Sequence, residues 1–171
     1  SRADAMFQGR WFLPGGQVRA PGGSSPFAAD PPSLTWAEEL HGFAWLRHFS
    51  AANAQNNGSA AREYARKLMS EWIEVEGRWH PVAWRPHVIG RRIISLVSNG
   101  PLIIDGSELV YRSTLLRNMA RQARHLARTA HRAPDGAPRI TAAMGLAFSG
   151  LCLSEGHRRL DTGLKLLCPE L

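Results

Sequence analysis

The chain has 171 residues, which suits one domain and would be cramped for two. Its 44% hydrophobic and 20% charged residues are ordinary for a globular protein and argue against a disordered or collagen-like chain. The 21 basic residues outnumber the 14 acidic ones, for a net charge of +7. This charge favours an anionic partner such as nucleic acid, acidic polysaccharide or a membrane surface, although genomic base composition equally explains an arginine-rich chain.

Cysteine content and hydropathy exclude several protein classes. Cys152 and Cys168 are the only cysteines, too few for a disulfide framework or a four-cysteine zinc site, and their apolar neighbours predict buried thiols. The longest uncharged run, 140–153, is too short to span a bilayer, so no membrane contact is predicted. The N-terminus lacks the charge-then-apolar order of a signal peptide. Because the chain stops just after an amphipathic run, we expect a fragment of a longer protein.

The first 34 residues are rich in proline and glycine, which interrupt any periodic pattern. They predict an irregular N-terminal arm. Trp11, Phe12 and Phe27 are apolar enough to hold this arm against a core. We therefore divide the chain into an arm, 1–34, packed on a helical domain, 35–171.

From Thr35 onward the apolar spacing is helical. Thr35 and Glu38 form a capping box for a helix that should reach about Ala52. A second helix should start at Ser59 and end at Gly77. Four more are predicted: 86–98, a long one from Asp105 or Ser107 to about His131, 139–154, and 158–168.

The predicted helices form three consecutive hairpins, and nothing alternates at period two. The fold class is therefore all-α with almost no sheet, arranged as a bundle, a solenoid or a toroid. Helix 139–154 is apolar on nearly every side and should be the most buried.

Three side chains of the first predicted helix share one face. His41, Trp45 and His48 follow i, i+4, i+7 spacing, and a face of imidazoles and indole suits the wall of a sugar-binding cleft. The alternative is that both histidines are buried partners of neighbouring helices. No metal site is predicted, because no third ligand stands at a recognisable spacing.

Two further groups carry polar or charged side chains. The segment 79–92 contributes Trp79, His80 and Arg92 as candidate binding residues, with loop anchoring as the alternative and the favoured interpretation for Trp84. On the fourth predicted helix, four arginines form a basic stripe that could follow an anionic polymer: Arg117, Arg121, Arg124 and Arg128. A solvated face is the favoured interpretation. Nucleic-acid binding has no second supporting signal in the sequence.

Phosphate-loop, nucleophile-elbow, HExxH and GxGxxG motifs are absent, so no cofactor is predicted. Residues 39–49, ELHGFAWLRHF, nevertheless resemble the first toroid helix of heparinase II/III-family proteins. Residues 7–11 resemble the arm that precedes that helix. Further similar segments lie at 72–73, 79–81, 91–95, 111–126 and 145–156.

This resemblance implies an incomplete (α/α) toroid followed by a β-sandwich, in a periplasmic or secreted lyase that cleaves acidic polysaccharide by β-elimination. No catalytic residue matches the family by position, so this chain alone is expected to be inactive and to supply part of the substrate cleft. The substrate-binding candidates are His41, Trp45, His48, Trp79, His80 and Arg92.

Truncation of the toroid would leave an apolar face open to self-association. The alternative function is a non-enzymatic basic helical module that binds a glycan or nucleic acid.

Overall fold

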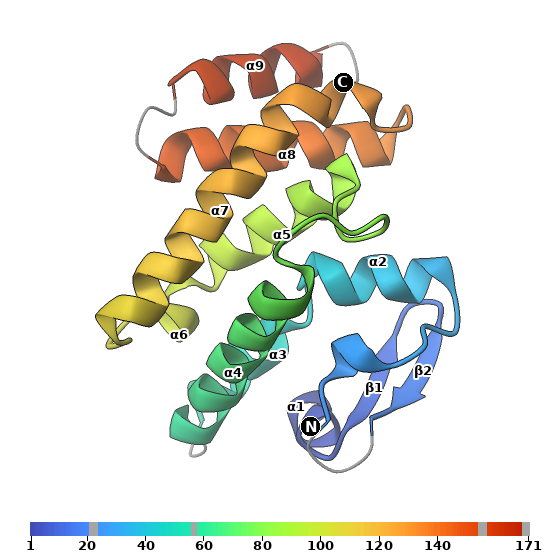
Figure 1. The fold of residues 1–171 in the computed structure, drawn as a ribbon, viewed down its shortest axis with the longest axis vertical. Coiled ribbons are helices and arrows are strands. Elements are labelled where there is room, and N and C mark those ends of the chain that lie inside the picture. The colour runs from blue at the N-terminus through green and yellow to red at the C-terminus, as the bar shows by residue number, and fades with distance from the viewer. Residues whose placement is uncertain (21–23, 56–57, 154–156, 169–171) are drawn as a thin grey trace.

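The computed structural model describes residues 1–20, 24–55, 58–153 and 157–168. Within these ranges the protein is helical apart from one small β-hairpin, so the all-α class is confirmed (Figure 1). The shape is elongated. Helices α8 (Ala137–Cys152) and α9 (His157–Leu167) lie at one end, and α1 (Arg2–Phe7) with the hairpin lies at the other.

The segment 1–34 is more regular than the sequence predicted. Besides α1, it forms two antiparallel strands, β1 (Arg10–Leu13) and β2 (Gly16–Arg19), and a short helix η1 (Pro26–Ala28). Pro14 and Gly15 form the turn between the strands, and Gly15 and the first strand residue Gly16 have φ 91° and 148°, a backbone region open to glycine. The expectation of an irregular arm was wrong because these glycines connect strands instead of ending order.

The first predicted helix is two helices, α2 (Leu34–Gly42) and α3 (Leu46–Asn53). Phe43 separates them with a left-handed φ of 61°, an uncommon conformation for a residue with a Cβ. Its ring lies in edge contact with Trp45 and Trp72, at 5.5 and 5.2 Å between centroids. Aromatic packing therefore sets this backbone break.

Side chains close the ends of α2. Its N-cap is Ser33, whose Oγ accepts from the Trp36 amide, so the capping box predicted at Thr35 was wrong. At the other end, Trp45 Nε1 donates to the Leu40 carbonyl at 2.9 Å. The same carbonyl also accepts from the Phe43 amide at 3.4 Å, so a side-chain donor and a backbone donor together close this end of the helix.

Later helices follow the sequence prediction closely. The second and third predicted helices are α4 (Gly58–Glu76) and α5 (Pro86–Ser98). The fourth is α7 (Leu109–Thr129), preceded by an unpredicted α6 (Gly100–Ile103) and followed by η2 (Ala130–Arg132). The last two match α8 and α9, although the predicted end at Ser154 lies outside the described residues.

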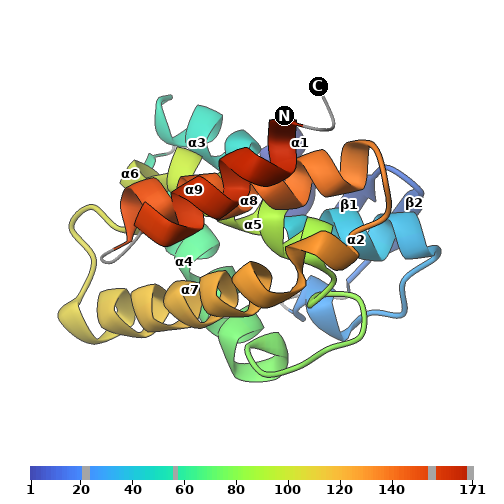
Figure 2. The same cartoon turned by 90° about the horizontal axis from the view of Figure 1, so that it is seen from above.

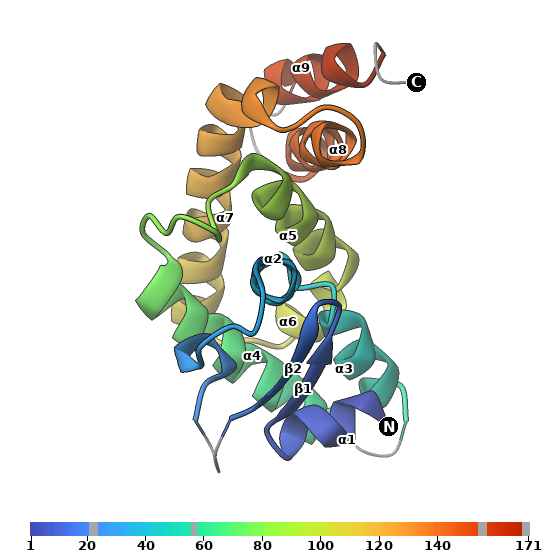
Figure 3. The same cartoon turned by 90° about the vertical axis from the view of Figure 1, so that its right-hand side faces the viewer.

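Two burial predictions failed at the C-terminal end. Helix α8 was expected to be buried on all sides, but Met144 and Leu151 are 38% and 68% exposed. Cys152 and Cys168 were expected to be buried thiols, and both are exposed. Helix α8 is covered by α9 on one side and by α5 on another (Figure 3), and Met144 and Leu151 lie on the part of its surface that remains exposed.

Helix α5 occupies the centre of the molecule and contacts α2, α7 and α8 (Figure 3). Helix α7 runs along one side of the stack formed by α5, α8 and α9 (Figure 2). On the side of α5 away from α8, the core is rich in fully buried tryptophans: Trp11, Trp36, Trp45 and Trp72.

Glycines bring α5 and α8 into backbone contact. A Cβ on Gly145 would lie 2.6 Å from the Gly90 carbonyl oxygen, and a Cβ on Gly90 would lie 2.8 Å from the Ala142 Cα. Both distances are shorter than real Cβ contacts. Neither position has room for a side chain.

Gly145→Ala should therefore destabilise the protein. The added methyl group must separate two helices, at a cost of about 1–3 kcal/mol that offsets any gain in helix propensity. Urea unfolding followed by circular dichroism measures the change. Gly100→Ala is the matched control, because a Cβ there meets no atom within 4 Å. Equal stability of both variants would contradict the close crossing.

Candidate functional site

Arg92 of α5 is fully buried, and its guanidinium joins three segments of the chain. Its Nε donates to Gln122 Oε1 of α7 at 2.7 Å. Its two terminal nitrogens donate to the His41 carbonyl of α2 at 2.7 Å and to the Ala83 carbonyl at 2.9 Å. A planar fork of five N–H donors can serve three directions at once, which a lysine cannot do.

The charge of Arg92 is kept without a hydrogen-bonded carboxylate. The guanidinium lies 4.3 Å from the centre of the Trp72 ring, in a cation–π contact. Burial lowers the pKa of Arg92 to about 9, while the nearby Glu76 carboxylate opposes this decrease. The side chain therefore remains charged at neutral pH.

His41 is buried beside this guanidinium and is neutral. Trp72 Nε1 donates to its Nδ1 at 3.1 Å, and the Phe27 ring stacks on the imidazole with centroids 6.0 Å apart. Burial lowers the pKa of His41 to about 3, with further decreases from Arg92 and His80. Since indole N–H is only a donor, Nδ1 is the acceptor and Nε2 carries the proton.

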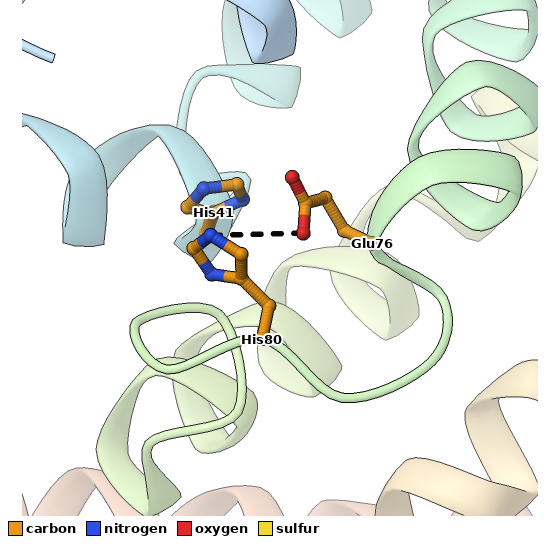
Figure 4. A group of neighbouring side chains, drawn as sticks. All are labelled: His41, Glu76 and His80. Carbon is orange, nitrogen blue, oxygen red and sulfur yellow. Dashed lines mark ion pairs between the residues drawn. The ribbon is translucent and has the colours of Figure 1, made fainter. Parts of the chain in front are cut away.

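His41, Glu76 and His80 form a close group of titratable side chains (Figure 4). One ligand atom from each lies within 4.8 Å of the others, and His80 Nε2 is 3.8 Å from Glu76 Oε2. Such a group has the residue types of a metal site. Whether it can hold a metal depends on which ring nitrogens are free.

The hydrogen bonds do not suit a metal ion. His80 Nδ1 accepts from the Val82 and Ala83 amides at 3.2 and 3.1 Å, and His41 Nδ1 accepts from Trp72. Neutral imidazole has one free lone pair, so Nε2 is protonated in both rings. A metal-bound histidine shows the opposite pattern, with its second nitrogen donating. The three side chains line a hollow of about 230 Å³, and their hydrogen bonds show that they serve the packing around it and not a metal ion.

The structure brings together three of the six predicted binding residues, namely His41, His80 and Arg92. The others lie elsewhere. Trp45 is buried in the core, and His48 is half-buried on α3, because the chain turns at Phe43 and the i, i+4, i+7 spacing no longer defines one face. Trp79 is 72% exposed.

The partners of this group were not predicted from the sequence. Trp72 entered only within the segment 72–73, and Gln122 and Glu76 were not singled out. Gln122 is buried on the apolar side of the arginine-rich helix α7. A polar residue at such a position is the sequence signal that could have identified it. Within the described ranges, the helices are too short or too polar to cross a membrane.

Comparison with known proteins shows which protein this chain is similar to. No family model and no solved structure matches the chain. The chain is similar to FtsZ-localized protein C of Caulobacter vibrioides. The two sequences are 30% identical over 166 residues, 97% of this chain. The chain spans 28% of the length of that relative.

This finding corrects the family prediction. The resemblance to the heparinase II/III toroid was wrong, and with it the predicted polysaccharide lyase and its acidic polysaccharide substrate, because the similarity found is to an FtsZ-localized protein. The alternative of a glycan- or nucleic-acid-binding module has no support from that relative either. The role of the six candidate residues in sugar binding loses its basis.

Replacement of Arg92 should be strongly destabilising. Arg92→Lys keeps the charge but cannot reach Gln122, His41 and Ala83 together, so buried acceptors lose their donors at a cost of about 3 kcal/mol or more. Urea unfolding measures the change. The control is Arg158→Lys on the exposed face of α9, which should stay within about 0.5 kcal/mol of the unmodified protein. Similar stability of the two variants would contradict the structural role of Arg92.

The low pKa of His41 predicts loss of stability in acid. Its pKa falls from 6.5 in the unfolded chain to about 3 in the folded one, so below pH 6.5 the unfolded state binds the proton first. From this group, the free energy of unfolding should decrease by about 1.4 kcal/mol per pH unit between these values. His41→Asn, which keeps an acceptor for Trp72, should flatten that slope. His131→Asn on an exposed residue should not. An unchanged slope in His41→Asn would refute the assignment.

Proposed function

We propose that this chain is a helical interaction module of a bacterial cell-division protein that associates with FtsZ assemblies. The observation that carries the proposal is the 30% identity to FtsZ-localized protein C over 97% of the chain. Because the similarity extends over nearly all of the folded body, the relative should contain a module of the same fold. The chain spans only 28% of that relative, so functions of its other parts are not assigned to this module.

The chemistry of the interior favours a binding role over catalysis. The three donor nitrogens of Arg92, the Nδ1 atoms of His41 and His80, and the indole of Trp72 are all used in contacts within the protein. These bonds hold helices together, so the bonded atoms are not free to bind a substrate. We therefore expect partners to bind at the outer surface, where the exposed Trp79 and several arginines lie.

Localisation with FtsZ tests the proposal. A fluorescent fusion of this chain, expressed in a bacterium, should concentrate at the FtsZ assembly at the division site. Purified chain should also sediment with assembled FtsZ and not alone. The control is the same fluorescent tag on an unrelated helical domain of similar charge. A fusion that stays diffuse, together with chain that remains in the supernatant, would refute the proposal.

A chimera extends this test to the longer relative. The matching segment of FtsZ-localized protein C is replaced by this chain, and localisation of the chimera is compared with that of a variant lacking the segment. We expect the chimera to localise like the unmodified relative. If the deletion also localises normally, the FtsZ-associated role belongs to another part of the relative.

A further inference from the structure

The most exposed aromatic side chain described in the structure is Trp79, which follows α4 in the connection to α5. It is 72% exposed, although a tryptophan has a large apolar surface that burial would stabilise. Trp79 lines a hollow of about 320 Å³ between this connection and α7. We call the side chains around it the Trp79 surface: Arg78, Trp79, Trp84, Arg121, His125 and Arg128.

The Trp79 surface continues along α7. Arg121 also lines a second hollow, of about 430 Å³, between α7 and Ile73 of α4. Arg117 and Arg124 border that hollow, and Ile73 and Ala120 give it an apolar wall. The two hollows therefore share one arginine and together form a continuous surface with both charged and apolar parts.

Among the described residues, no acidic side chain forms an ion pair with the arginines of this surface. Arg78, Arg117, Arg121, Arg124 and Arg128 form no ion pair within the described part of the chain. No acidic side chain lines either hollow. Arg121 is instead held in place, since it donates to the Gly77 carbonyl and lies 5.8 Å from the centre of the Trp84 ring. Its guanidinium is thus partly preorganised.

This combination fits a protein partner better than a uniform polyanion. Tryptophan and arginine are the residue types that contribute most to binding at protein interfaces. Arginine forks bind carboxylates in bidentate geometry, whereas the exposed indole and the apolar walls need an apolar side chain. A phosphate or sulfated-sugar chain carries the charge but offers no aliphatic group for Ile73 and Ala120.

We propose that the Trp79 surface docks an acidic segment of a partner protein. An apolar side chain of that segment packs against Trp79, and its carboxylates pair with Arg121 and Arg128. The proposal rests on the proposed function only in placing the partner within the FtsZ assembly. The docking surface itself is argued from the exposure of Trp79 and the unpaired arginines.

A short fluorescein-labelled peptide tests the surface directly. The probe contains Asp and Glu on both sides of a central Leu-Phe pair, and its binding to the whole chain is followed by fluorescence anisotropy. We expect saturable binding that weakens as salt increases, because exposed charges are screened. Trp79→Ala should weaken it by about fivefold or more, the threshold for an important interface residue.

Charge variants and control probes separate docking from simple charge attraction. Arg121→Gln with Arg128→Gln should weaken binding and reduce its salt dependence, whereas Arg158→Gln on α9 should change neither. A peptide with Ser-Ser in place of Leu-Phe, and a DNA duplex of similar charge, should bind more weakly than the probe. If these polyanions bind equally well and Trp79→Ala has no effect, the surface is only a basic face and the proposal is wrong.

Sedimentation with FtsZ distinguishes this proposal from the proposed function. Trp79 and the two arginines are exposed, so their variants should fold, which thermal unfolding verifies. If unmodified chain and Trp79→Ala sediment equally with FtsZ, the docking surface is refuted and the FtsZ association stands. If the chain binds the probe peptide but not FtsZ, the FtsZ association is refuted and the docking surface stands.

Discussion

The buried guanidinium of Arg92 is the interaction on which the rest of the structure depends. It hydrogen-bonds to α2, to α7 and to the connection that precedes its own helix, so four segments take their positions from one side chain. A buried charge is costly unless its surroundings supply well-placed acceptors. The acceptors are Gln122 Oε1 and the carbonyl oxygens of His41 and Ala83. The helix break at Phe43 lies just after His41.

Local sequence signals predicted the helices well where those signals act alone. Pro86 and Gly77 mark ends of α5 and α4 that the structure confirms. The break at Phe43 could not be predicted, because its left-handed backbone is stabilised by rings that come from distant positions, above all Trp72. The N-terminal hairpin was missed for a related reason. Its glycines were taken as signs of irregular structure, although the same residues permit a tight turn.

The candidate site was half predictable. His41, His80 and Arg92 stand out as residue types, but helical spacing gives the direction of a side chain and not its depth. With α2 ending one residue after His41, that side chain turns inward to Trp72. The hollow beside it is lined by Glu76 and His80, and not by Trp45 and His48 as predicted. The predicted family failed because its likeness rested on diffuse helical patterns, which unrelated all-α proteins share. Trp79 was named as a candidate binding residue from its residue type, whereas its exposure depends on where the chain leaves α4.

Glycines allow α5, α8 and α9 to approach one another through their backbones. Gly163 of α9 sits against the α8 backbone, where a Cβ would be 2.8 Å from the Ala143 carbonyl oxygen, and Gly145 sits in the same way against Gly90 of α5. Three backbones are thus stacked without a compliant layer of side chains between them. Gly90 is two residues from Arg92. A side chain added at Gly90 or Gly145 would therefore displace the helix that carries the buried guanidinium.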